Sequence, residues 1–171
     1  MKKLKKGQWG FTLLELVIVI GLTGLIAGGL TLMIMRVFNM DARTRDDMIA
    51  VYQVRQAGKL VSQDILEAQI VNPNNATGSN GFPLILTRTV GATNYAVNYT
   101  LADMSGGLKI LWRKHYTNSV LDSTTKVAEY ISYPAGTSCA WAGGVLTFTV
   151  TATVGGQNET RVYEVKPRPG T

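Results

Sequence analysis

The chain has 171 residues, a length that fits one modest domain together with a membrane segment. Its formal net charge of +6 overstates how basic the folded part is, because the first ten residues hold four lysines and no acidic residue. The remainder carries 13 basic and 11 acidic residues, so the composition does not point to nucleic acid as a partner. A single cysteine, Cys139, excludes an intramolecular disulfide, and we expect it to behave as a small, partly buried apolar residue.

The N-terminal region combines a basic start with a long apolar run. Lys2, Lys3, Lys5 and Lys6 precede twenty residues without a charge, Leu16 to Met35. At about 1.5 Å per residue this run can cross a bilayer core of roughly 30 Å. The flanking lysines predict that the N-terminus stays in the cytoplasm and that the C-terminal part is exported. Two alternatives are a plain signal anchor and a secretory signal cleaved near Ala27-Gly28-Gly29.

One acidic residue, Glu15, stands at the start of the apolar run, five positions after Gly10 and four after Phe11. A carboxylate beside a membrane span is costly without a partner, so Glu15 is a functional candidate. The basic leader, the Gly10-Phe11 pair, the lone Glu15 and the apolar run together resemble the N-terminal signature of the type IV pilin-like superfamily.

This resemblance implies a task for each of these residues. Prepilin peptidase would cut after Gly10 and methylate the new amine of Phe11, and Glu15 would pair with such an amine during filament assembly. The implied partners are that peptidase, other pilin or pseudopilin subunits, an inner-membrane assembly platform and the lipid bilayer. The implied location is a single-pass membrane protein that later joins a filament.

Residues from Phe11 to about Asn72 are predicted to be helical. Beyond Arg36 the apolar residues recur at spacings of three and four and form one face: Val51, Val54, Gly58, Val61, Ile65 and Ala68. Thr44-Arg-Asp-Asp47 has the form of a capping box and indicates a possible fresh helix start. Asn72-Pro73 should end the helix, because proline disfavours helical geometry in the residue before it.

The C-terminal part alternates apolar and polar residues as strands do. Predicted strands cover 82–89, 95–101, 108–114, 127–133, 145–154 and 160–166, with hairpin turns at Ser105-Gly106-Gly107 and at 155–158. The strand from Val145 to Val154 has one apolar face and one threonine face, which predicts an antiparallel sheet with one solvated side. The amphipathic helix should cover the other side.

Three further segments are similar to the strand–turn–strand core of J-type minor pseudopilins of type II secretion and of related minor pilins: Val97–Leu101, Gly107-Leu108 and Leu111–Arg113. No residue set predicts catalysis, a metal site or a cofactor. His115 has no evident partner in the sequence, and Tyr99, Trp112 and Trp141 are more typical of a sheet than of a binding surface.

The sequence therefore predicts an α+β protein in four parts. These are a prepilin leader (1–10), a transmembrane and filament-core helix (11–36), an amphipathic exported helix (37–72) and an antiparallel β domain (73–171). The leading functional hypothesis is a non-enzymatic minor pilin or pseudopilin that assembles into, or caps, a filament for secretion, adhesion or DNA uptake. Alternatives are a pilus-tip subunit that itself binds a ligand or DNA, and a plain signal-anchored exported domain.

Overall fold

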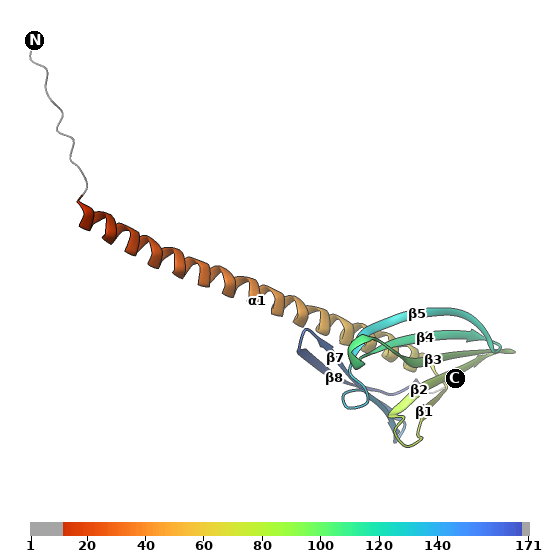
Figure 1. The fold of residues 1–171 in the computed structure, drawn as a ribbon. Coiled ribbons are helices and arrows are strands. Elements are labelled where there is room, and N and C mark those ends of the chain that lie inside the picture. Colours follow the sequence, from red (N-terminus) through yellow and green to blue (C-terminus); the bar gives the residue numbers. More distant parts are fainter. Residues whose placement is uncertain (1–11, 169–171) are drawn as a thin grey trace, which may run out of the picture. The chain divides into compact units, whose positions relative to one another are not determined.

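The computed structural model describes residues 12–168. Within this range, one long helix precedes an antiparallel sheet, which confirms the predicted α+β fold (Figure 1). The elements are α1 (Leu13–Glu67), β1 (Ile70–Asn74), β2 (Gly81–Val90), β3 (Thr93–Asp103), a 3₁₀ turn (Ser105–Gly107), β4 (Lys109–Thr117), β5 (Val120–Ile131), β6 (Ser138–Ala142), β7 (Val145–Val154) and β8 (Gln157–Val165).

Helix α1 continues through the segment where a second helix start was possible. Thr44 to Asp47 lies inside α1, so the capping-box pattern there does not begin a new helix. The chain nevertheless divides between Ala42 and Arg43 into two compact units. The functional boundary that we predict at residues 36–37 remains a prediction.

The end of α1 corrects the expectation that Asn72-Pro73 would terminate it. The helix ends at Glu67, and the Gln69 N–H already donates to the Thr87 carbonyl at 2.9 Å. Residues 70–74 then pair with β2 as strand β1. Tertiary pairing thus ends the helix before the proline is reached, and Pro73 fits β1 because an edge strand tolerates a missing N–H.

The sheet has two parts that meet at one point. Strands β1 to β5 form an antiparallel meander, and β7 lies between β6 and β8. A single residue pair, Ile131 with Ala152, joins β5 to β7. The free edges of the two parts also approach each other, because the Cys139 N–H in β6 donates to the Asn80 carbonyl at 2.8 Å. The sheet therefore curls.

The helix residues from Ala50 onward bury one face against this sheet, and most of the predicted residues lie on it. Val51 is an exception, because it is only half-buried, and Ala50 and Ala57 are buried although they were not predicted. The fully buried helix side chains recur at spacings of three and four and belong to one buried cluster with large apolar side chains of the strands. They are Ala50, Val54, Ala57, Val61 and Ile65; among the strand residues are Leu84, Leu111, Leu146 and Phe148.

Small helix residues allow a very close approach to β8. A Cβ atom placed on Gly58 would lie 2.0 Å from Cζ of Tyr163, so the aromatic ring occupies the space that a side chain would need. The Tyr163 hydroxyl donates to the Val54 carbonyl at 3.2 Å. Gly58 thus permits the contact between α1 and β8.

The predicted faces of β7 are confirmed. Leu146, Phe148, Val150, Ala152 and Val154 are all buried. The threonines alternate with them on the other face; Thr151 among them is buried, and its hydroxyl donates to the Gly136 carbonyl at 2.7 Å.

Three strands differ from the sequence prediction. Strands β1 and β6 were not predicted, and β5 begins at Val120 instead of Val127. Both missed strands have only five residues, and residues 120–126 are exposed and mostly polar. Residues 120–126 and β6 lack the half-buried alternation on which strand prediction depends, and β1, although its burial alternates, is a five-residue segment interrupted by Pro73.

Candidate functional site

Glu15 lies in the first turn of α1. Its main-chain N–H donates to the Thr12 carbonyl at 3.0 Å and to the Thr12 hydroxyl at 3.3 Å. Thr12 therefore caps the helix N-terminus, and Thr12 to Glu15 has the spacing of a capping box, which our sequence analysis overlooked. A carboxylate in this turn is also favoured by the helix dipole. Glu15 thus has a local structural role available besides any role in assembly.

The other predicted N-terminal site residues lie outside the described residues. They are the leader lysines Lys2, Lys3, Lys5 and Lys6, and the cleavage and methylation positions Gly10 and Phe11.

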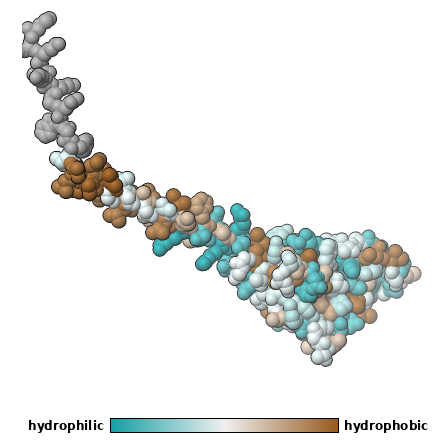
Figure 2. All heavy atoms as spheres, viewed as in Figure 1, coloured by the Kyte–Doolittle hydropathy of each residue, from teal (hydrophilic) through white to brown (hydrophobic). Residues whose placement is uncertain are grey.

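Apolar side chains are exposed all along the N-terminal part of α1, and Figure 2 shows one face of this segment. Among residues 12–168, α1 is the one helix long and apolar enough to cross a membrane. Gly21, Gly24, Gly28 and Gly29 have no neighbouring heavy atom within 4 Å of the position of a Cβ. A helix that is apolar all round needs lipid or other helices to cover it.

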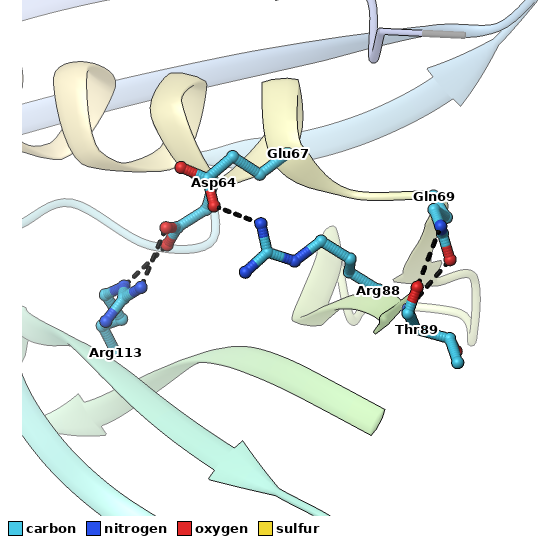
Figure 3. Close-up of polar contacts among 6 residues, drawn as sticks. All are labelled: Asp64, Glu67, Gln69, Arg88, Thr89 and Arg113. Atoms are coloured by element: carbon cyan, nitrogen blue, oxygen red, sulfur yellow. Dashed lines mark hydrogen bonds and ion pairs between the residues drawn. The ribbon is translucent and has the colours of Figure 1, made fainter. Parts of the chain in front are cut away.

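A partly buried ion pair fixes the other end of α1 to the sheet. Asp64 receives two hydrogen bonds from Arg113 of β4, at 2.6 Å from Nε to Oδ2 and at 2.9 Å from Nη2 to Oδ1 (Figure 3). The Tyr99 hydroxyl of β3 donates to the same Oδ2 at 2.5 Å. We call Asp64, Tyr99 and Arg113 the Asp64 cluster.

The electrostatics of the Asp64 cluster follow from its burial and its charges. The pKa of Tyr99 is raised mainly by burial, and the adjacent Asp64 carboxylate raises it further. The hydrogen bond to Asp64 raises the pKa of Arg113, although partial burial opposes this. The phenol therefore stays protonated and the guanidinium stays charged, so the cluster serves as a fixed clamp and not as a proton-transfer site.

Asp64 was not recognised from the sequence as a member of such a cluster. Its spacing along α1 puts it only one position from the buried Ile65, but nothing in the local pattern indicates a partner 49 residues away. The prediction that Tyr99 belongs to the sheet core is confirmed, since this side chain is fully buried.

A second, more exposed set of contacts follows one turn later. Glu67 accepts a hydrogen bond from Arg88 of β2 at 2.9 Å, and the Arg88 guanidinium lies 5.3 Å from the centre of the Tyr95 ring. The Gln69 side-chain amide donates to the Thr89 carbonyl at 3.2 Å and accepts a hydrogen bond from the Thr89 N–H at 2.9 Å (Figure 3). These contacts hold the end of α1 and the residues that follow it against strand β2.

His115 has a partner that the sequence did not reveal. Its Nδ1 lies 3.0 Å from Oδ2 of Asp122, and the Thr117 hydroxyl donates to the same oxygen. The pair forms because β4 and β5 are adjacent antiparallel strands. Within residues 12–168, no group of three His, Cys, Asp or Glu side chains is arranged to hold a metal ion.

A small open cavity lies between the end of α1 and the sheet. The cavity bordered by Asp64, Glu67, Arg88 and Arg113 has a volume of about 50 Å³. Such a volume accommodates a few water molecules at most. Cys139 is buried as expected, and burial raises the pKa of its thiol, which makes it an unreactive packing residue.

Comparison with known proteins identifies the N-terminal segment. Residues 5–31 match the family described as the prokaryotic N-terminal methylation motif. No curated protein and no solved structure matches the chain. The match covers the leader lysines Lys5 and Lys6, the Gly10-Phe11 pair, Glu15 and most of the apolar run. It supports the resemblance to type IV pilin-like proteins at the N-terminus, and the motif is that of a prepilin peptidase substrate.

Proposed function

We propose that this chain is a minor pilin or pseudopilin, a structural subunit processed by prepilin peptidase and built into a pilus-like filament. The observation that carries the proposal is the match of residues 5–31 to the N-terminal methylation motif. It coincides with a helix segment whose apolar side chains are exposed on every side.

In this proposal the leader directs the chain into the membrane with its basic end in the cytoplasm, and the β domain is exported. The peptidase cuts after Gly10, where the absent side chain lets the backbone enter a narrow active site. Methylation then modifies the amine of Phe11. The apolar surface of α1 passes from lipid to contacts with other subunits without meeting water.

Glu15 gives the assembly step its register. A charged amine and a carboxylate are each costly in an apolar surrounding, and pairing them offsets part of that desolvation. We propose that the Phe11 amine of one subunit pairs with Glu15 of a neighbour. The domain would follow the helix into a filament, because the Asp64 cluster fixes the C-terminal end of α1 to the sheet.

The proposal is tested by co-expressing the full chain with a prepilin peptidase and measuring the N-terminus and the intact mass. We expect a chain that begins at a methylated Phe11, and we expect Gly10→Val to retain the leader. A wild-type chain that keeps residues 1–10 would make the protein a plain signal-anchored domain. Efficient processing of Gly10→Val would show that the peptidase cuts elsewhere.

Two substitutions separate the possible roles of Glu15. Glutamine can replace glutamate in a capping box but carries no charge. Glu15→Gln should therefore be processed normally yet fail to enter filaments, as should Glu15→Ala. If Glu15→Gln assembles as well as the wild type, the contribution of Glu15 is helix capping and the pairing argument is wrong.

A further inference from the structure

The curled sheet leaves one long strand edge unprotected. Unpaired edges are templates for pairing with another chain, and proteins commonly block them with proline, bulges, lysine or a short strand. The edges of β1 and β6 are short, β1 contains Pro73, and the main chain of Asn80 contacts that of Cys139 between them. These two edges are closed to a further strand.

The free edge of β5 is also protected. Its pairing with β4 is irregular at three places. Asp122 and Val127 have no directly opposite residue in β4, and Lys126 lies between them. Bulges twist an edge away from a flat partner, and lysine on an edge disfavours a further strand.

Strand β8 lacks these protections, although three of its nine residues are charged: Glu159, Arg161 and Glu164. It pairs with β7 in nine consecutive, regular pairs from Val154↔Gln157 to Leu146↔Val165, and the strand contains no proline, bulge or lysine. Among the described residues, no strand pairs with its outer side. In an antiparallel hairpin with a two-residue loop, every second residue directs its main-chain N–H and C=O away from its partner strand. In β8 these residues include Asn158, Thr160 and Val162, whose main-chain groups therefore face the outer side. The Val162 side chain is 58% exposed.

The charges of β8 are complementary to those of a second β8. Glu159 and Arg161 flank Thr160 and lie on the same face of the strand. When two copies pair antiparallel with Thr160 opposite Thr160, Glu159 of each copy faces Arg161 of the other. Centring the pair on Asn158 or Val162, the neighbouring residues whose main chain also faces outward, would place neither Glu159 nor Arg161 opposite a charged residue. The sequence thus selects one symmetric register.

We propose that two copies of this chain associate through the outer edge of β8, antiparallel and centred on Thr160, to form one continuous sheet. The interface is two-fold symmetric, and the same residues contribute from both sides. Main-chain hydrogen bonds supply the attraction, and the two Glu159–Arg161 pairs between the copies fix the register. This inference does not depend on the proposed function.

The test uses full-length chains inserted singly into lipid nanodiscs, so that the apolar parts of α1 cannot associate between chains. Association is followed by sedimentation and by energy transfer between two fluorescent labels. The wild type should associate with increasing concentration. Glu159→Arg and Arg161→Glu should each weaken association by about tenfold, because each replaces two opposite-charge contacts by like-charge contacts.

Mixing the two variants distinguishes pairing between chains from an effect within one chain. In the mixture, the two arginines of the Glu159→Arg chain face the two glutamates of the Arg161→Glu chain, so association should return to the wild-type level. The hydrogen bond between Arg161 and Glu159 of one chain, at 3.0 Å, is lost in both variants and stays lost in the mixture. Circular dichroism melting of each variant checks that the domain is folded.

A charge-independent variant completes the test. Val162→Pro removes one outward N–H without touching the charges and should also abolish association. The proposal is overturned if the wild type stays monomeric at the highest concentration reached, if the single charge variants associate like the wild type, or if the mixture associates no better than its components.

Discussion

The Asp64 cluster should contribute more to stability than the exposed ion pair beside it. The Asp64 and Arg113 side chains are 15% and 23% exposed, whereas Glu67 and Arg88 are 65% and 38% exposed. Removing one member of a buried pair costs about 3–5 kcal/mol, and an exposed pair contributes about 0–1 kcal/mol. Because the Asp64 cluster retains some contact with water, we expect Asp64→Asn to lower the free energy of unfolding by about 2–3 kcal/mol.

The control is built into the same helix. Glu67 lies one turn from Asp64 and also binds an arginine of the sheet, so Glu67→Gln changes the same chemical group in a more exposed place. We expect it to cost less than about 1 kcal/mol. In thermal melts followed by circular dichroism, Asp64→Asn should lower the Tm by roughly 10 °C, at about 4 °C per kcal/mol for a domain of this size.

A double-mutant cycle isolates the pair itself. Asp64→Asn combined with Arg113→Met should cost less than the sum of the single changes, because the second change removes the unpaired charge that the first leaves behind. Equal losses for Asp64→Asn and Glu67→Gln, or strict additivity in the cycle, would refute the reasoning that burial makes this pair strong.

Three further predictions follow from the packing, the pKa shifts and the motif. Gly58→Ala should cost about 1–3 kcal/mol in urea unfolding because its Cβ would meet the Tyr163 ring, whereas Gly28→Ala, with open space around it, should be neutral. The Tyr99 phenol has its pKa raised above its ordinary 10.0, so the folded state holds a proton that the unfolded state loses. Stability should therefore fall by about 1.4 kcal/mol per pH unit above roughly pH 10, and Tyr99→Phe should remove that slope; an unchanged slope would show that another group causes it. Glu15→Asp, which keeps the charge, should support filament entry better than Glu15→Gln in a fractionation of sheared filaments, and the reverse order would contradict the pairing proposal.

The sequence predicted those parts of the fold in which local pattern and tertiary environment agree. The buried helix face was found because Val54, Gly58, Val61 and Ile65 recur at helical spacing, and β7 because its apolar and threonine residues alternate. The end of α1 was predicted too late in the sequence. The helix ends before Pro73 because Gln69 pairs with Thr87, and no local sequence pattern indicates this pairing.

The candidate site divides in the same way. The Gly10-Phe11 pair and Glu15 lie within one linear motif, which the family match covers, so roles can be proposed for them from sequence alone; these roles stay predictions. The Asp64 cluster and the pair of His115 with Asp122 join residues from different elements. Their partners are determined by strand register, and one sequence without the fold does not provide the register.

The contacts of α1 with the sheet have a consequence for the order of folding. The buried face of α1 is synthesised early, but its partners come from later parts of the chain: Gln53 binds the main chain of Glu129, and Val54 binds Tyr163 of the last strand. Because contacts between residues so far apart in sequence form slowly, the apolar face from Ala50 to Ile65 must stay incompletely covered until β8 has been made. Until then this apolar face is open to aggregation, and we expect the domain to reach its stable state only after the C-terminal hairpin has been synthesised.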